Sequence, residues 1–386
     1  MRIFHACHGI LVTRKDDDTT FYLNGVQSVG WNKGFDTVNI LDNGRSQPID
    51  TLYTNQQYSS ISVERAVANY TPEADKCVGP FLHKIFFNDN HHPTNYKLGY
   101  FPKKFGMCVT GNKNHDIKQF DLTMLYQTDT GLKLENSGAR NLFRGIFNQC
   151  LISSFGYNID RTNIRENIEF QYKSCEVDTN SSYAKEQVTL GDLYDTNKIR
   201  NLIRPRDFDK TYSLLPDILT GITDTNTFVD GSEVFGITEI SSSIQLSYNN
   251  FLDQGKWNGY NDTDNNMWTL LQLPLNVETT IKFTARKGVA MSLYNRPEFS
   301  GVGAVTAKKY PIRLAFTARN YSNSSDDLFI IDLGSKNVIN SLDVTGGDAS
   351  GGNIEYSMSF RNFSNDFVTY FTPKLSPIFL TQTERY

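Results

Sequence analysis

A cluster of histidine and cysteine side chains near the start of the chain is the first candidate for chemistry. The string is His5-Ala6-Cys7-His8, and the pair His91-His92 follows later. A structural zinc site needs a closed set of sulfur or imidazole ligands, usually supplied by paired motifs such as Cys-x2-Cys. No such pair completes either cluster. We therefore expect ordinary core or surface roles for these residues, with no bound metal and no cofactor.

Carboxylates on strand-like runs are the second candidate. Glycoside hydrolysis needs two carboxylates at a defined separation, and strand faces could supply Glu64, Glu169, Glu278 and Glu355. These residues recur in pairs between two similar parts of the chain, which favours a shared structural position such as a cross-strand charge pair. No order of Ser, His and Asp stands out as a catalytic triad. We expect no catalytic residue and no enzyme; a sugar-binding β-sandwich or glycoside hydrolase is the less favoured alternative.

A glycine-rich string at residues 345–352 could bind phosphate. A phosphate loop continues with Gly-Lys-Ser/Thr and opens a helix, whereas alternating strand-like residues follow this string. The pattern predicts a flexible hairpin tip. The cysteines are odd in number and widely spread, which favours free thiols. They are Cys7, Cys77, Cys108, Cys150 and Cys175.

Charge and hydropathy exclude several classes of function. A formal charge of −4 and a pI near 5.9 argue against a chain that neutralises phosphates on nucleic acid. No apolar run approaches the roughly 20 residues that cross a bilayer, and the first residues have no adequate signal-peptide core. We expect a chain made in the cytosol, with no membrane partner.

Composition predicts a mainly β fold. Aromatic residues make up 13% of the 386 residues, with frequent Thr, Ser, Asn and Val, and these types favour strands. Alternating runs predict a first hairpin at residues 10–23, a long hairpin whose strands flank a loop at 42–48, and closing strands at 144–157 and 164–172. A few short helices are expected, including a weak one at 190–203.

Two strings recur in order, which predicts a tandem duplication. Leu41-Asp42-Asn43-Gly44-Arg45 returns as Leu252-Asp253-Gln254-Gly255-Lys256. Ile152-Ser153-Ser154, leading to residues 167–172, returns as Ile339-Asn340-Ser341, leading to residues 353–358. The length also exceeds what one core usually serves. We predict a first β module at residues 1–176, a connector at 177–235 and a second β module at 236–386.

Several of these strings together resemble a known family. The first part contributes Asn24 to Gly30, the Leu-Asp-x-Gly loop, Ile61 to Arg65, and Cys150 to Tyr157. The second part contributes Gln245-Leu246, Pro274 to Glu278 and Ile331 to Asn337. They resemble the tail-tube and related virion structural proteins of tailed bacteriophages, here with a duplicated module.

The resemblance implies two tandem β-sandwich or half-barrel modules whose long hairpins join those of neighbouring subunits in a ring. It further implies a structural subunit of a phage tail tube, with trimeric or hexameric rings stacked around a channel through which DNA passes without sequence-specific binding. The implied partners are other copies and other phage tail proteins. The implied location is the virion tail, assembled in the host cytoplasm. A collar, tube-terminator or distal-tail ring of the same virion is the alternative.

Two loops, at residues 36–54 and 249–268, are predicted to contact the adjacent ring. Each combines a glycine with one acid and one base, and the second adds aromatic residues of the types that dominate interfaces. The alternative is that the Trp residues fold back onto their own module. The predicted contact residues are Asp42, Gly44, Arg45, Asp253, Gly255, Lys256, Trp257, Tyr260 and Trp268.

Overall fold

The computed structural model describes most of the strand-forming parts of the chain. The described residues are 3–14, 20–23, 25–40, 50–67, 120–128, 142–172, 174–178, 203–220, 235–246, 248–250, 252–253, 256–257, 269–271, 276–285, 307–318, 327–346, 354–362 and 368–373. Within them the fold is mainly β, which confirms the predicted class.

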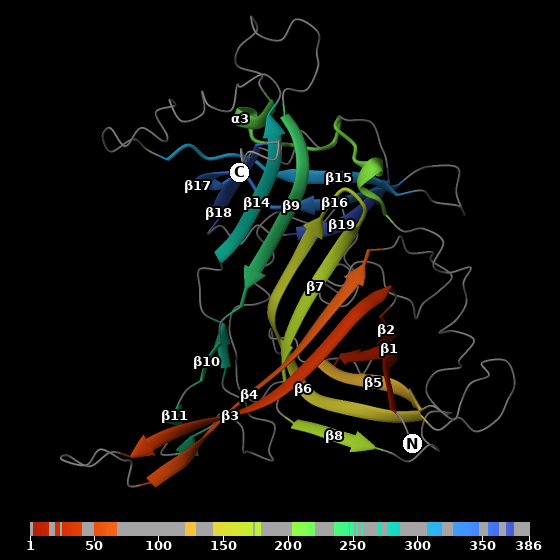
Figure 1. The fold of residues 1–386 in the computed structure, drawn as a ribbon, viewed down its shortest axis with the longest axis vertical. Helices are drawn as coiled ribbons and strands as arrows, with labels where there is room; N and C mark the ends of the chain where they lie inside the picture. Colours follow the sequence, from red (N-terminus) through yellow and green to blue (C-terminus); the bar gives the residue numbers. More distant parts are fainter. Residues whose placement is uncertain are drawn as a thin grey trace, which may run out of the picture.

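Long antiparallel strands dominate both halves of the chain (Figure 1). The first half contains β1 (Ile3–Arg14), β2 (Thr20–Tyr22), β3 (Val26–Ile40), β4 (Asp50–Ala66), β5 (Phe120–Thr128), β6 (Leu142–Ile159), β7 (Ile164–Gln171) and β8 (Ser174–Asp178). The second half contains β9 (Phe235–Gln245), β10 (Tyr248–Asn250), β11 (Leu252–Asp253), β12 (Lys256–Trp257), β13 (Thr269–Leu271), β14 (Asn276–Ala285), β15 (Arg313–Ala318), β16 (Asp327–Asp332), β17 (Val338–Thr345), β18 (Glu355–Asn362) and β19 (Val368–Pro373). Between them lie the short helices η4 (Pro205–Asp207) and α3 (Asp217–Thr220).

Eight of these strands form what we call the main sheet, in the order β3-β4-β7-β6-β9-β14-β18-β17. The order consists of one four-stranded unit, β3-β4-β7-β6, followed by a second, β9-β14-β18-β17. Corresponding strands therefore occupy corresponding places in the two units. The units join edge to edge where β6 pairs with β9, so the main sheet crosses the boundary between the halves without interruption.

The side sheets repeat the same correspondence. In the first half, β5, the N-terminal part of β6 and β8 lie in that order, with β1 and β2 added outside β5. In the second half the order is β15-β16-β19. Both orders place the strand that leads into the main sheet between its two neighbours, as expected of a duplicated topology.

The registers repeat down to the positions of β-bulges. The β6–β7 ladder shifts between Ile152 and Ser154, and the β17–β18 ladder shifts between Ile339 and Ser341. These are the residues that the repeated string aligned. Bulges are local irregularities with defined positions in a fold, so their recurrence supports the tandem relationship independently of strand order.

A second pair of bulges lies on the hairpins. The β3–β4 ladder shifts opposite Glu64 and Arg65, and the β9–β14 ladder shifts opposite Lys282 and Phe283. Because these two bulges are equivalent, Ser28 corresponds to Glu239. The number of residues between Ser28 and Glu239 equals the number between Leu41 and Leu252. The first string match therefore agrees with the strand register.

The end of the second string match does not agree with the strand register. It aligned Ile168 with Ile354, but the bulged ladders place Ile168 opposite Phe155 and Met358 opposite Leu342, so Ile168 corresponds to Met358. The match slipped by an even number of residues, which keeps the buried face buried. The alternating apolar pattern alone could not reveal the error.

One continuous core supports both halves, although the chain length predicted two. The largest buried cluster extends from Ile10 in β1 to Phe360 in β18. Tyr157 of the first half contacts Phe329 of the second, with ring centroids 6.0 Å apart. The predicted boundaries at residues 176 and 236 stay a prediction.

The chain passes from side sheet to main sheet differently in each half. In the first half, β6 runs through both sheets and turns at Gln149, which has a φ of 53°. In the second half, separate strands β16 and β17 are joined through Gly334, which has a φ of 76°. A positive φ suits glycine; at Gln149 the backbone N–H donates to the Asp121 carboxylate at 2.9 Å.

Residues 208–214 of the predicted connector are folded onto the second half, whereas the Ile203 N–H donates to the Val67 carbonyl of the first half at 3.0 Å. Backbone N–H groups of Asp209 and Leu214 donate to the carbonyls of Ala315 and Arg313, both at 2.8 Å. Tyr212 packs with Ala315 in a small buried cluster on β15 and β16. The weak helix predicted at residues 190–203 lies outside the described residues, apart from Ile203.

Candidate functional site

The main sheet has one apolar face and one polar face. On β4, Ile61 and Val63 are buried while Ser62 is exposed and Glu64 half-buried; the same alternation follows β7, β9, β14 and β18. The ladders carry this alternation from strand to strand. One face therefore packs on the core, and the other is a continuous surface, which we call the polar face.

Small and neutral polar side chains cover much of the polar face. They come from all eight strands of the main sheet. They are Ser28, Asn32, Ser60, Ser62, Asn167, Gln171, Ser154, Asn158, Ser241, Ser243, Gln245, Thr280, Ser357, Ser359, Ser341 and Thr345. Antiparallel sheets often expose one face to water, but this surface spans two units and is poor in apolar side chains.

The charges on the polar face are mixed, with an acidic excess. The acids are Glu64, Glu169, Glu239, Glu278, Asp343 and Glu355; the bases are Arg165, Lys282 and Arg361. Six acids and three bases give a net formal charge of −3 for the described face. A surface of this sign repels phosphate groups.

Most of the bases are paired with acids across strands. Lys282 Nζ lies 2.7 Å from Glu239 Oε2, and Arg361 Nε lies 3.2 Å from Glu278 Oε1. The Glu239 hydrogen bond raises the pKa of Lys282. Of the four glutamates predicted to form cross-strand charge pairs, Glu64 and Glu278 do so, with Arg165 and Arg361. The predicted equivalence of the glutamates was wrong, because the registers place Glu64 with Lys282.

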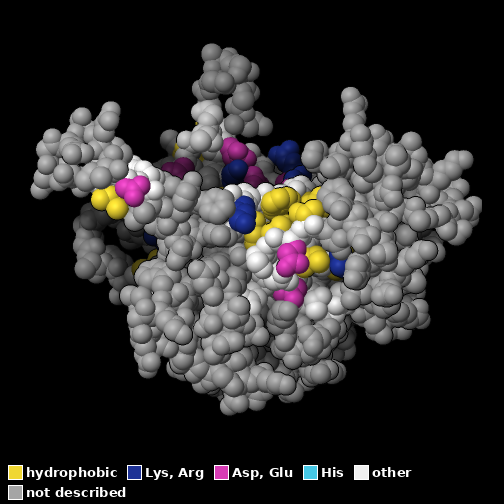
Figure 2. Space-filling model, turned by 90° about the horizontal axis from the view of Figure 1, so that it is seen from below, with side chains coloured by type: hydrophobic (Ala, Val, Ile, Leu, Met, Phe, Trp, Pro, Cys, Tyr) yellow, Lys and Arg dark blue, Asp and Glu magenta, His cyan; other side chains and the backbone are white. Residues whose placement is uncertain are grey.

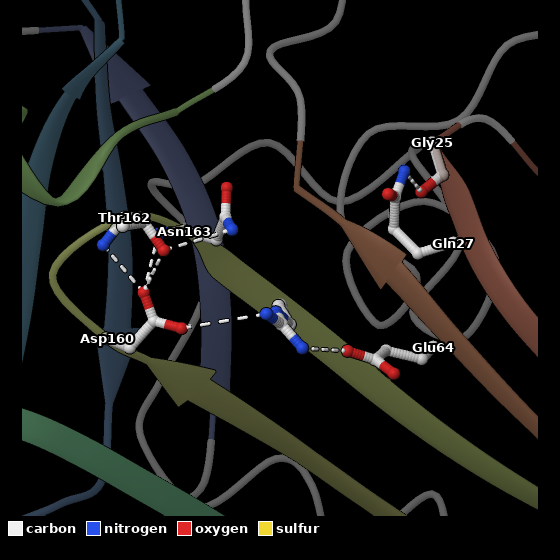
Figure 3. A network of polar contacts seen from close by, with 7 residues as sticks. Gly25, Gln27, Glu64, Asp160, Thr162 and Asn163 are labelled. Carbon is white, nitrogen blue, oxygen red and sulfur yellow. Dashed lines mark hydrogen bonds and ion pairs between the residues drawn. The ribbon is translucent and has the colours of Figure 1, made fainter.

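A network of polar contacts lies at the β6–β7 turn, beside the polar face (Figure 3). Asp160 Oδ1 accepts hydrogen bonds from the backbone N–H groups of Thr162 and Asn163 at 2.6 and 2.8 Å. Arg165 lies between Asp160, at 3.8 Å, and Glu64, at 2.6 Å. The hydrogen bond from the Thr162 hydroxyl is the main cause of the lowered pKa of Asp160. This network ties β4 to the turn.

Strands β3 and β17 lie at the two ends of the main sheet. Within the described residues, β3 pairs with β4 and β17 pairs with β18, each on one side only. Trp31 on β3 is 47% exposed and Val344 on β17 is 40% exposed. Edge strands with apolar side chains are ready to pair with further strands.

The β3 edge is held firmly against its own half. The Tyr172 hydroxyl donates to the Asn32 carbonyl at 2.8 Å, and the Asn32 side chain accepts from the backbone N–H of Ser60 at 2.9 Å. Trp31 also contacts Phe147 edge to face, with centroids 5.7 Å apart. Part of the indole thus packs inward while nearly half of the residue stays exposed.

A charged row is buried beneath the first unit. Arg65, Glu166 and Tyr157 lie opposite one another on β4, β7 and β6. The Arg65 and Glu166 side chains are fully buried, with Nε and Oε2 3.3 Å apart, and the Tyr157 hydroxyl donates to Glu166 at 2.9 Å. The sequence interpretation missed this row, although alternation from Ile61 and Val63 places Arg65 on the buried face.

The structure places only part of the predicted inter-ring contacts. Asp253, Lys256 and Trp257 lie on β11 and β12, a small hairpin in which Leu252 pairs with Trp257 and Asp253 with Lys256. In Figure 1 this hairpin and the ends of β3 and β4 extend toward the same lower corner of the view. Asp42, Gly44, Arg45, Gly255, Tyr260 and Trp268 lie outside the described residues. Their role stays a prediction.

Metal ligands and thiols are two kinds of reactive group that the described residues allow us to follow. In this part of the chain, no group of three or more His, Cys, Asp or Glu side chains is placed to hold a metal ion. Cys150 is buried, and burial is the main cause of the raised pKa of Cys175; both effects disfavour a reactive thiolate.

Seen from below, acidic and basic side chains lie interspersed around a group of hydrophobic ones (Figure 2). Among the described helices, none is long and apolar enough to span a membrane.

Comparisons with known proteins give little further information. No protein-family model matches the chain, and no curated protein matches it. Among solved structures, the chain is similar to one in a cryo-EM structure of the anti-feeding prophage baseplate. That match has a TM-score of 0.27 and 10% sequence identity, and it covers 46% of this chain and 97% of the other. A likeness of this degree carries no argument about fold or function.

Proposed function

We propose that this protein is a structural subunit of a phage-like tail, which assembles with its own copies into a ring around a channel. The observation that carries the proposal is the main sheet, with its long hairpins, one buried face, one continuous polar face and two edge strands. A ring that joins the edges of neighbouring sheets removes those edges. The polar face then lines the inside of the ring.

The composition of the polar face suits the passage of DNA. DNA carries one negative charge per roughly 1.7 Å of its axis, and a lining with net charge −3 repels it. Hydroxyl and amide groups keep the wall wetted, while the paired bases are partly neutralised by their acids. Such a wall offers neither an electrostatic binding site nor an apolar surface to which bases could adhere.

The repeated four-stranded unit and the sequence resemblance to tail-tube proteins support the same proposal. A subunit with two units supplies twice as many strands to a ring as a subunit with one. A trimer of this chain would thus match a hexamer of single-unit subunits, and a hexamer is the larger alternative. Stacking of rings through the loops at residues 36–54 and 249–268 is the further part of the proposal. We propose a structural role without catalysis.

Native mass spectrometry and negative-stain microscopy of the purified chain test this proposal. We expect closed rings with three-fold or six-fold symmetry at micromolar concentration, and short stacks at higher concentration. Added duplex DNA should show no measurable affinity even at low salt, where non-specific binding is strongest. A monomer or a two-fold dimer at all concentrations would overturn the proposal.

A second experiment addresses stacking separately from ring formation. Trp257→Ala, in the second predicted loop, should leave single rings intact and shorten the stacks, because large aromatic residues are common interface hot spots. Val177→Ala, an exposed apolar position on β8, serves as the control. Single rings that never stack would favour a collar, tube-terminator or distal-tail ring over a tube.

A further inference from the structure

The junction between β6 and β9 shows how one four-stranded unit joins the next. The two strands are antiparallel, and their ladder pairs Phe155 with Ile244, Gly156 with Ser243, Tyr157 with Ser242 and Asn158 with Ser241. Tyr157 is 1% exposed and Ser242 5% exposed. The last strand of the first unit therefore pairs with the first strand of the second unit, and the joined row is buried.

The same two kinds of strand end the main sheet. Strand β17 corresponds to β6. The β17–β18 ladder and the β6–β7 ladder each contain a bulge at the equivalent place and keep the same register beyond it. Strand β3 corresponds to β9, because the β3–β4 ladder and the β9–β14 ladder contain equivalent bulges. The main sheet thus ends in one strand of each type that the internal junction joins.

We propose that β17 of one copy pairs with β3 of the next copy in the register of the internal β6–β9 junction. Carrying the equivalences across, Tyr157 corresponds to Val344 and Ser242 to Trp31. Val344 of one copy then lies opposite Trp31 of the next, with Asp343 opposite Asn32 and Thr345 opposite Gly30. This inference rests on the proposed ring and defines the residues that close it.

Exposure of the edge residues supports this register. Five large hydrophobic side chains are exposed within the described residues: Trp31, Ile40, Val177, Val344 and Ile354. Two of them, Trp31 and Val344, occupy the opposed positions of the proposed pair. Aromatic and β-branched side chains make favourable cross-strand pairs. A slip of one residue would turn Trp31 and Val344 toward different faces of the joined sheet.

The polar side of the junction is compatible with the same register. Asp343 and Asn32 both lie on the polar face and are exposed. An amide opposite a carboxylate can donate a hydrogen bond to it, and no like charges oppose each other in this row. The junction therefore joins the polar faces of neighbouring copies into one surface and buries the apolar pair beneath it.

Paired cysteine substitutions test the register directly. Opposed residues in an antiparallel ladder have Cα atoms about 4.5 to 5.5 Å apart, which suits a disulfide. We expect Asn32→Cys with Asp343→Cys, and separately Trp31→Cys with Val344→Cys, to give intermolecular disulfides after mild oxidation of the ring. Peptide mapping distinguishes them from links between the native cysteines. The slipped combination Asn32→Cys with Val344→Cys should link at least about tenfold less, because its side chains face opposite sides.

An edge-blocking substitution gives a second reading that does not need cysteine chemistry. Val344→Lys places a charge on the β17 edge and should raise the dissociation constant of the ring roughly tenfold or more, because edge lysines oppose strand pairing. Circular dichroism and thermal unfolding of the monomer should stay unchanged. The matched control is Val177→Lys, an exposed apolar residue on β8 outside the main sheet, which should leave the ring intact.

The outcomes separate this inference from the proposed function. If the slipped cysteine variant links as well as the in-register ones, or if the Val344→Lys variant still forms rings, the register is overturned while the ring stays in place. Wild-type protein that forms no ring overturns the proposed function and the junction together. In-register links together with ring loss in Val344→Lys support the proposal.

Discussion

The two units fill the same buried position of the sheet with different kinds of side chain. In the first unit, Arg65 and Glu166 form a fully buried ion pair on β4 and β7. The registers place Phe283 and Tyr356 at the equivalent positions on β14 and β18, where their rings stack with centroids 5.5 Å apart and planes inclined by 11°. One backbone arrangement thus accommodates either a charged pair or an aromatic pair.

The difference between the two pairs shows what this buried position requires. A buried ion pair loses hydration that its Coulomb attraction only partly restores, so well-packed apolar residues of similar volume are often equally good or better. Breaking such a pair is a different matter, because it leaves one uncompensated charge in the core. The position therefore demands two side chains that match each other, and either chemistry satisfies this demand.

The third member of the row differs because of its neighbours. Tyr157 on β6 is buried, because β9 continues the sheet beside it. Its equivalent, Val344, lies on the last strand and stays exposed. The comparison therefore also distinguishes an internal junction from an edge.

Removing one charge from the buried row should have the largest effect. We expect Glu166→Gln to lower the free energy of unfolding by about 3 to 5 kcal/mol, since Arg65 then keeps an unpaired buried charge. Chemical denaturation of the ring-deficient Val344→Lys background measures this without a contribution from assembly.

The matched variant makes the whole row apolar. Arg65→Met, Glu166→Leu and Tyr157→Phe together should restore stability to within about 1 kcal/mol of the parent or above it. A triple variant as unstable as Glu166→Gln would show that the first unit depends on the charges themselves, and the comparison with Phe283 and Tyr356 would fail.

Crowding at the internal junction should have the next largest effect. A Cβ added at Gly156 on β6 would press against the backbone carbonyl oxygen of Ser242 on β9. Gly156→Ala should therefore cost about 1 to 3 kcal/mol, as overpacking usually does, and hydrogen exchange should increase along β6 and β9. At Gly30 the nearest neighbour of an added Cβ is the movable Ser62 side chain, at 3.1 Å. Gly30→Ala should be much milder, and equal costs would argue against a tight junction.

Charge pairs on the polar face should contribute less. The Arg165–Glu64 pair of the first unit is closer and less exposed than the Arg361–Glu278 pair of the second, at 2.6 against 3.2 Å. We expect Glu64→Gln and Glu278→Gln each to cost less than about 1 kcal/mol, with the larger cost at Glu64 and both costs reduced by salt. Thermal unfolding at low and high ionic strength measures these differences.

The smallest expected effect is a pH dependence of stability that comes from the β6–β7 turn of the first unit. The lowered pKa of Asp160 in the folded protein means that its carboxylate contributes stability above its ordinary pKa of about 3.9, and that this contribution disappears as pH falls through the folded value. Asp160→Asn should thus lower the melting temperature at neutral pH and approach the parent in acid. In the ring-deficient Val344→Lys background, Asp343→Asn on strand β17 of the second unit is the control. A pH-independent difference at Asp160 would show that the turn does not depend on ionisation.

The strands and their repetition followed from the amino-acid pattern alone. Period-two alternation is local, so the long hairpin around residues 42–48 and the closing strands followed from it. Glycine conformation is local too: an Asn-Gly pair favours a tight turn with positive φ, and Gly25 has a φ of 70°. The alternation also contained the buried row, because Arg65 lies in phase with Ile61 and Val63.

Tertiary structure alone decided how the repeated units are joined. The alternating pattern is equally satisfied by several registers, so the string match that aligned Ile168 with Ile354 could slip. Whether the units kept separate cores or shared one depended on the pairing of β6 with β9, between strands far apart in the chain. The candidate site followed only then, because a polar residue on an isolated strand merely faces water. Aligned across two joined units, such residues form a continuous face bounded by two strands that still have an edge to pair.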